Sequence, residues 1–221
     1  MDFPELVFPG LLHVLAVPLV LTWLIAALWY LPRQHLRDNG FTHVFFGACV
    51  AVLLLWSIHA TVSPTLHFHL LGVTALTLMF GWQYASVGVA LILVGSTLNG
   101  QGSWVTFAVN YLTMGCIPIL VTSFLLRWAQ RRLPHNFFIY IYINAFLAAG
   151  VSIVATGFTG AGLLWVTGTH SLDWLGYQYL AFTPLMFFSE AVMTGMVMTL
   201  LVALRPEWVC SFNDNLYING K

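Results

Sequence analysis

Charged side chains are scarce in this sequence. Only 6% of its 221 residues are Asp, Glu, Lys or Arg, whereas about 25% of the residues of a soluble domain are charged. With 60% hydrophobic residues, the chain lacks the polar surface that a soluble domain turns to water. The net charge of zero gives no reason to expect a nucleic acid as a partner. We therefore expect residues 1–221 to form one integral membrane domain in a lipid bilayer.

The motifs of common soluble enzymes and of cysteine-based metal sites are also missing. Cys49, Cys116 and Cys210 lie far apart and form no CxxC pair, so we expect neither a zinc knuckle nor a disulfide framework. The sequence contains no HExxH, GxSxG or Walker motif. We therefore expect no enzyme activity, and any ATP-driven step would need a partner chain. The start of the chain carries Asp2 and Glu5 but no Lys or Arg, the reverse of a signal peptide.

Long apolar segments fill most of the chain. They run over residues 11–31, 42–59, 69–81, 84–98, 105–127, 137–157 and 176–204, and several reach the roughly 20 residues that a helix needs to cross a bilayer. The third and fourth are short, and Gly81, Trp82 and Gln83 separate them. As one helix they would measure about 43 Å at 1.5 Å per residue, which is long for a core of about 30 Å. Hydropathy alone leaves six and seven crossings open.

The basic residues decide between these two counts. They form three groups, which follow the first segment, follow the fifth segment and lie in the C-terminal tail: Arg33 and Arg37; Arg127, Arg131 and Arg132; Arg205 and Lys221. Seven crossings place all three groups on the cytoplasmic side, as basic loops require, whereas six crossings split the first two groups. We predict an all-α polytopic membrane protein of about seven transmembrane helices, N-terminus outside and C-terminus inside. A re-entrant hairpin at 69–98, which dips in from the outside, would leave all three basic groups on the same side of the membrane.

Three histidines near the predicted outer face form a candidate metal site. His59, His67 and His69 lie within eleven residues, and imidazole is a common ligand of transition metals. In an extended loop His67 and His69 point the same way, whereas in a helix they diverge. The alternative is that these side chains hydrogen-bond to the loop backbone. The α-amine of Met1 and the carboxylate of Asp2 are further candidate ligands, although an acidic start also serves solubility.

Three polar residues elsewhere are functional candidates. Glu190 lies near the middle of the last apolar segment, where a carboxylate is costly unless it is paired or protonated. Glu190 either has a relay role or forms a structural hydrogen bond between helices. Asn110 is close to the start of the fifth segment, and we expect it to support the histidine loop. Gln101 lies in the glycine-rich turn Asn99–Ser103, where a polar outer loop explains it equally well.

Several short motifs together resemble the cobalt/nickel energy-coupling-factor permeases of the CbiM/NikM type. The runs HLLG at 69–72, LMFGW at 78–82, LNGQGSWVT at 98–106 and NYLTMG at 110–115 are similar to the family patterns HLLG, LxGPW, FGDGGxT and NxxNMG. A weaker similarity continues through EAVMTG at 190–195 and Arg205-Pro206. The resemblance covers about residues 51 to 207, and the family has a similar seven-helix, N-out arrangement.

The resemblance implies a metal site at the start of the chain. In the family the N-terminal amine, a histidine at position 2 and the histidine of HLLG hold the metal. Met1 and His69 match this pattern, whereas Asp2 replaces the histidine and Gln101 replaces an acidic residue. We therefore expect a rebuilt site from His67, His69 and His59, completed by the amine or Asp2. Such a mixed set suits zinc, manganese, iron or cobalt better than nickel.

The leading interpretation is a substrate-capture membrane component for uptake of a divalent transition metal ion from the outer side. The resemblance implies a coupling membrane subunit and ATP-binding subunits as partners. The alternative is a solitary scaffold that binds another small ligand or a membrane partner. A third interpretation, an intramembrane metal-dependent hydrolase, requires Glu190 within about 5 Å of the histidines. We expect its mid-helix position to place it deeper than the outer loop.

Overall fold

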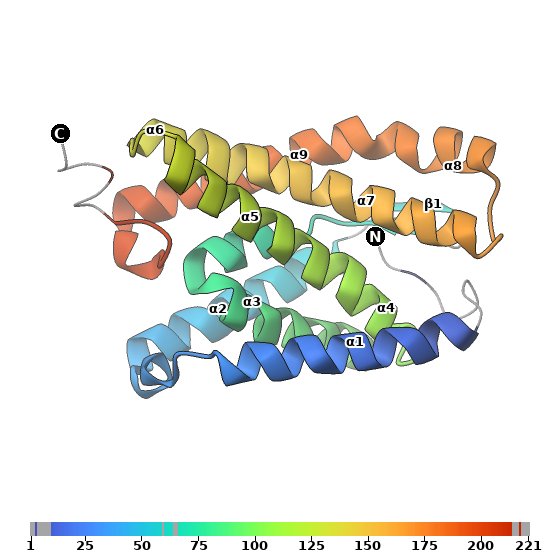
Figure 1. Cartoon of the computed structure of the whole chain (residues 1–221), viewed down its shortest axis with the longest axis horizontal. Coiled ribbons are helices and arrows are strands. Elements are labelled where there is room, and N and C mark those ends of the chain that lie inside the picture. Colours follow the sequence, from blue (N-terminus) through green and yellow to red (C-terminus); the bar gives the residue numbers. More distant parts are fainter. Residues whose placement is uncertain (1–2, 4–9, 59, 64–65, 214–216, 218–221) are drawn as a thin grey trace.

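The computed structural model describes residue 3 and residues 10–58, 60–63, 66–213 and 217. Over these residues the chain forms a bundle of long helices with one β-hairpin (Figure 1). The elements are α1 (Gly10–Trp29), α2 (Asn39–Ser57), β1 (Ala60–Ser63), β2 (Leu66–Phe68), α3 (Val73–Leu98), α4 (Phe107–Asn110), α5 (Ile117–Arg132), α6 (Phe137–Ile139), α7 (Ala148–Val166), α8 (Leu172–Gln178) and α9 (Thr183–Leu204). Two π-helical stretches, Tyr111–Cys116 and Tyr140–Leu147, join α4 to α5 and α6 to α7.

Six helical stretches among the described residues are long and apolar enough to cross a membrane. They are Leu12–Trp29, Asn39–Ser57, Val73–Leu98, Phe107–Arg132, Phe137–Val166 and Leu172–Leu204. This confirms the prediction of a helical, multi-pass membrane protein. The predicted segments 69–81 and 84–98 correspond to one of the six, helix α3, except that residues 69–72 form a turn before it.

Helix α3 is itself two helices that meet at Gly81. The backbone there has φ 81° and ψ 166°, a conformation that only glycine adopts readily. We call residues 73–80 the first half of α3 and residues 82–98 the second half. The directions of the two halves follow from their contacts with α2.

The first half of α3 runs antiparallel to α2. At its start, a Cβ added to Gly72 would lie 3.3 Å from the side chain of Val52, near the end of α2. At its end, the rings of Phe80 and Phe45 are 5.3 Å apart. Residue numbers therefore rise along the first half as they fall along α2.

The second half of α3 runs parallel to α2. The rings of Tyr84 and Phe41 are 4.9 Å apart, and a Cβ added to Gly95 would lie 3.0 Å from Leu53. The chain therefore doubles back at Gly81, so the two halves are the third and fourth segments of the sequence analysis. This is the hairpin geometry that the re-entrant alternative described.

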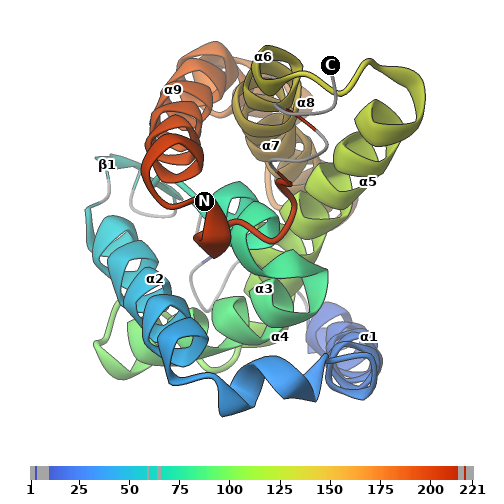
Figure 2. The same cartoon turned by 90° about the vertical axis from the view of Figure 1, so that its left-hand side faces the viewer.

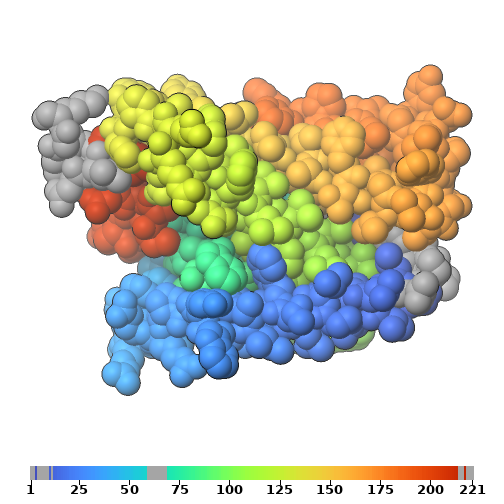
Figure 3. Space-filling view, in the orientation of Figure 1, coloured from blue at the N-terminus to red at the C-terminus, as the bar shows by residue number. Residues whose placement is uncertain are grey.

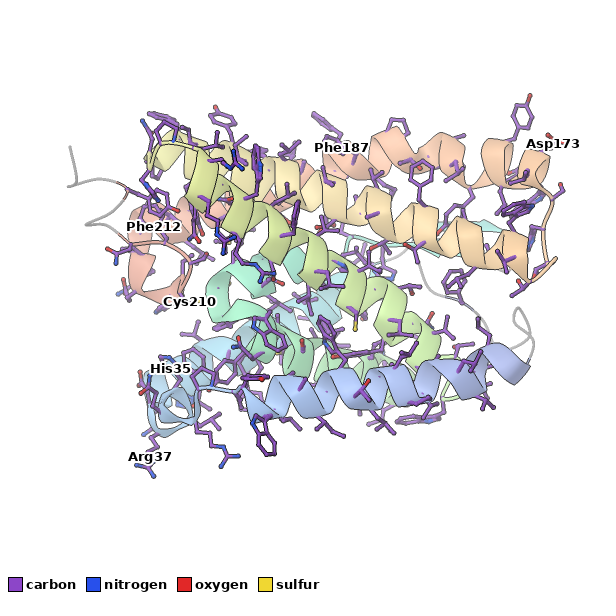
Figure 4. The ribbon with its side chains drawn as sticks, in the orientation of Figure 1. His35, Arg37, Asp173, Phe187, Cys210 and Phe212 are labelled. Carbon is purple, nitrogen blue, oxygen red and sulfur yellow. The ribbon has the colours of Figure 1, made fainter. Side chains whose placement is uncertain are left out.

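The basic residues of the described chain gather at one end of the bundle. The 3-10 turn Arg33–Arg37, the end of α5 and the end of α9 lie together at the left of Figure 1. Figure 4 places His35, Arg37, Cys210 and Phe212 there and Asp173 at the opposite end. We call these the arginine end and the cavity end. Which of the two faces the cytoplasm stays a prediction.

The core of the bundle is built around α3, and α1 lies at its edge. Seen from the arginine end, α3 is surrounded by α2, α5, α7 and α9, with α1 apart from them (Figure 2). Figure 3 shows α1 as a separate layer along one side. Its side chains Val14, Leu19 and Ile25 are each more than half exposed, as expected for a face in contact with lipid. The indole Nε1 of Trp23 donates to Oγ of Ser86 at 3.0 Å and ties α1 to α3.

Candidate metal site

A polar cavity of about 230 Å³ lies at the cavity end, between α2, the second half of α3 and α4. Three of the residues singled out from the sequence line it, namely His69, Gln101 and Asn110. The remaining walls combine hydroxyl groups with bulky apolar side chains: Ser96, Thr97, Ser103, Trp56, Leu93, Phe107 and Met114. Its size suits a small cation better than a large organic ligand, which needs about 300–1,000 Å³.

His69 is held in one orientation beside this cavity. Its side chain is 6% exposed, and its ring lies 5.0 Å from that of Trp56. Nδ1 is 3.1 Å from the carbonyl oxygen of Leu70. Because a carbonyl oxygen only accepts, Nδ1 carries the proton and the lone pair of a neutral ring lies on Nε2. This hydrogen bond selects the tautomer that presents Nε2 to a metal.

The turn that follows His69 is fixed from two sides. Nε1 of Trp56 donates to the carbonyl oxygen of Leu71 at 2.9 Å. From α9, Oε2 of Glu190 accepts from the backbone N–H of Leu71 at 2.7 Å, and Oε1 accepts from that of Gly72 at 2.8 Å. Gly72 has φ 65°, a left-handed conformation that favours glycine. The turn 69–72 is therefore held by α2 and α9 together.

The expectation that Glu190 lies much deeper than the histidines was wrong for His69. Its carboxylate bonds to the residues two and three positions after His69. The reason is that the chain re-enters the bundle after β2, so the turn 69–72 lies at the level of Glu190 on α9. Both carboxylate oxygens accept backbone N–H groups, so Glu190 ties helix α9 to the turn 69–72.

Asn110 binds the beginning of the chain. Its Oδ1 accepts from the backbone N–H of Phe3 at 3.2 Å, and its Nδ2 donates to the carbonyl oxygen of Phe3 at 3.4 Å. Nδ2 also lies 3.2 Å from Oγ1 of Thr106. The sequence predicted that Asn110 supports the histidine loop, and this stays a prediction; the bonds described here place the third residue of the chain beside the cavity.

A pocket for the ring of Phe3 completes this anchor. The side chain of Phe3 is 2% exposed. A Cβ added to Gly160 of α7 would lie 2.9 Å from the ring of Phe3 and 2.8 Å from the hydroxyl oxygen of Tyr179. Glycine at position 160 therefore makes room for the chain start.

Gln101 ties the loop after α3 to α2. Its Oε1 lies 3.3 Å from Oγ of Ser57, which donates to it. The loop turns at Gly100, whose φ of 74° favours glycine. Gln101 therefore closes one wall of the cavity.

The structure does not describe all of the predicted ligands. Met1, Asp2 and His59 lie outside the described residues, and only the backbone of His67 is described. His67 lies in β2, opposite Thr61 in the antiparallel pair, so its backbone is extended as the prediction of a shared site required. Among the described side chains, no three His, Cys, Asp or Glu residues are grouped as metal ligands. The full ligand set stays a prediction.

Trp56 and Phe3 are site residues that the sequence did not single out. A tryptophan at the end of an apolar helix is typical of an interface anchor, and a phenylalanine near the chain start has no special signal. Their roles depend on partners that are distant in the sequence, such as Asn110, which is 107 positions from Phe3.

Comparisons with known proteins agree with this geometry. The profile of the CbiM family, described as the cobalt uptake substrate-specific transmembrane region, matches residues 3–208. Two solved structures share the fold. A truncated transition metal transporter has a TM-score of 0.77 and 17% identity over 92% of this chain and 99% of its own. A second transition metal transporter has a TM-score of 0.76 and 17% identity over 92% and 93%. No curated protein matches the sequence.

Proposed function

The chain belongs to the CbiM family of cobalt-uptake substrate-specific membrane proteins, and we propose that it captures a divalent transition metal ion, its substrate, in the cavity beside His69. Membership of the family makes the protein a multi-pass membrane component of metal uptake. The proposal adds where the ion binds and which residues hold it.

The observation that carries the proposal is the environment of His69. A histidine that is 6% exposed, with Nδ1 bonded to a backbone carbonyl, lines a cavity with Gln101 and Asn110. Metal-binding histidines commonly bond through their second nitrogen in this way. An imidazole that served only to fill space would need no polar cavity in front of it.

The anchoring of Phe3 supports a role for the first two residues. Asn110 both binds Phe3 and lines the cavity. Consecutive Cα atoms are about 3.8 Å apart, so a chain fixed at Phe3 keeps Met1 and Asp2 within about 8 Å of it. We propose that the amine of Met1 or the carboxylate of Asp2 joins His69, with His67 and His59 completing the set. These donors suit zinc, manganese, iron or cobalt.

Uptake against a gradient needs an energy source that this chain lacks. The sequence contains no Walker motif, so we propose that ATP-binding subunits and a coupling membrane subunit supply the drive. The proposed location is the inner membrane of a bacterium, with the cavity end facing outward. This orientation places the Arg groups on the cytoplasmic side, as basic loops require.

Titration of purified protein in detergent with Co²⁺ tests the site. We expect wild-type protein to bind one ion and His69→Ala to bind it at least about a hundredfold more weakly, more than the loss typical of an outer-shell change. Asn110→Ala should weaken binding about tenfold or more, since it releases the chain start. His43→Ala is the matched control because His43 is exposed on α2.

The outcomes separate the two parts of the proposal. Unchanged affinity in His69→Ala would reject the cavity as the binding site. Failure of the wild-type protein to bind Co²⁺, Zn²⁺, Mn²⁺, Fe²⁺ or Ni²⁺ would reject metal capture itself.

A further inference from the structure

Glu190 is a fully buried carboxylate on helix α9. Its side chain is 1% exposed, and the single ion pair among the described residues joins Arg205 to Glu207. A carboxylate within a membrane-spanning helix is costly unless its oxygens are satisfied. Here the backbone N–H groups of Leu71 and Gly72 satisfy them at 2.7 Å and 2.8 Å. These are short, charge-assisted hydrogen bonds. They satisfy the buried carboxylate and fix the backbone of the turn 69–72.

The opposite end of the first half of α3 is also fixed by the chain that follows α9. The backbone N–H of Cys210 donates to the carbonyl oxygen of Met79 at 2.9 Å. Ser211 donates twice to the carbonyl oxygen of Leu78, from its N–H at 3.2 Å and from its Oγ at 2.7 Å. Helix α9 and the chain that follows it therefore form hydrogen bonds with this short helix or the turn before it at both ends.

Because Cys210 and Ser211 hold the end of the first half of α3, Glu190 sets the position of the turn 69–72 at its start. Leu71 is two residues from His69, and Trp56 contacts both of them, through a hydrogen bond to Leu71 and through its ring to His69. A shift of the turn would carry the ring of His69 with it. We propose that Glu190 is a positioning residue, which holds His69 in the place from which Nε2 binds the metal ion. This inference rests on the proposed function of the cavity.

The chemistry of the side chain makes the role testable. A carboxylate offers an acceptor oxygen to each of the two N–H groups. Glutamine offers one oxygen and one NH₂ group, and the NH₂ group would face an N–H donor and repel it. Aspartate keeps both oxygens but is shorter by one CH₂ group, so it reaches the turn only if the helix or the turn moves. Glu190→Gln therefore changes the turn while it preserves the size of the side chain.

A double-mutant cycle with Co²⁺ as the probe separates positioning from general stability. We expect Glu190→Gln to weaken Co²⁺ binding about tenfold or more, the range seen when outer-shell partners are removed. In a His69→Ala background the same change should have no further effect, because Glu190 acts through His69. The visible spectrum of bound Co²⁺ should change in Glu190→Gln, because the imidazole of His69 is displaced, whereas in a His69→Ala background Glu190→Gln should leave the spectrum unchanged.

Two controls account for folding. Trp23→Phe removes the hydrogen bond from the indole Nε1 to Oγ of Ser86 and does not touch the turn, so it should lower the melting temperature of the metal-free protein without changing the affinity. Glu190→Asp tests the case in which Glu190→Gln does not fold, and it should recover part of the affinity.

The results discriminate between this inference and the proposed function. Equal losses from Glu190→Gln with and without His69 would show a structural role only and overturn the inference. So would unchanged affinity in a folded Glu190→Gln variant while His69→Ala loses binding. If wild-type protein binds no metal, the proposed function fails instead.

Discussion

The two halves of α3 are consecutive in the sequence but differ in their burial and in the contacts that stabilise them. Every residue from Val73 to Phe80 is buried, whereas Leu91 and Leu98 of the second half are 44% and 73% exposed. The first half is about 12 Å long at 1.5 Å per residue, too short to cross a hydrocarbon core of about 30 Å. The second half is long enough to approach the cavity end.

This difference shows where the stability of each half comes from. A helix of two turns forms few internal hydrogen bonds and is marginal by itself. The first half depends on groups outside it, with Glu190 at its start and Cys210 and Ser211 at its end. The second half packs along α2 over its length. Changes at the ends of the first half should therefore affect the metal site. Changes at the start of the second half, which lies at the arginine end away from the cavity, should affect mainly stability.

The largest effect on this arrangement is expected from Gly81→Ala. At φ 81° and ψ 166°, any side chain strains the backbone by about 1–3 kcal/mol. A Cβ there would also lie 3.3 Å from Oε1 of Gln83. Because the reversal between the halves needs this conformation, we expect the apparent melting temperature of the purified protein to fall by several degrees.

Gly162→Ala is the matched control for this change. Gly162 lies in α7 without a positive φ, and a Cβ there would meet nothing within 4 Å. Alanine is a better helix former than glycine by about 1 kcal/mol, so the control should melt at the same temperature or slightly higher. Equal melting of both variants would contradict the reversal at Gly81.

The sequence predicted much of this fold from simple physical rules. Apolar length predicted the spans, and the interruption at Gly81, Trp82 and Gln83 marked the place where the chain doubles back. It did not reveal that the first half begins only at Val73, because the apolar run from His69 looks continuous. The turn 69–72 is held by tertiary contacts, which hydropathy does not record.

The site was less predictable for the same reason. A lone carboxylate on an apolar helix indicated that Glu190 matters, but its partners are 118 and 119 positions away. Its depth along α9 suggested separation from the histidines, because the sequence left re-entry of the chain at 69–98 as one of two alternatives and did not place the turn 69–72. The support of the histidine loop by Asn110 stays a prediction, whereas its pairing with Phe3 is a contact that no spacing rule indicates.

A smaller effect is expected from Trp56→Phe, which tests the support of the first half from α2. Phenylalanine keeps an aromatic ring beside His69 but loses the hydrogen bond to Leu71, worth about 1 kcal/mol. We expect a few-fold loss of Co²⁺ affinity and a small drop in melting temperature. Trp128→Phe, at a residue that is 44% exposed, should change neither. Unchanged affinity in Trp56→Phe would mean that α9 alone fixes the turn.

The smallest effect is expected from Tyr84→Phe, at the start of the second half. The hydroxyl of Tyr84 donates to the carbonyl oxygen of Pro32 at 3.0 Å and joins α3 to the connection after α1. Its loss should lower stability by about 0.5–1.5 kcal/mol, measured as the melting temperature. Co²⁺ affinity should stay the same, because this contact lies at the arginine end, away from the cavity. If affinity fell as well, the two halves of α3 would move as one body, and the metal site would respond to contacts at the opposite end of the bundle.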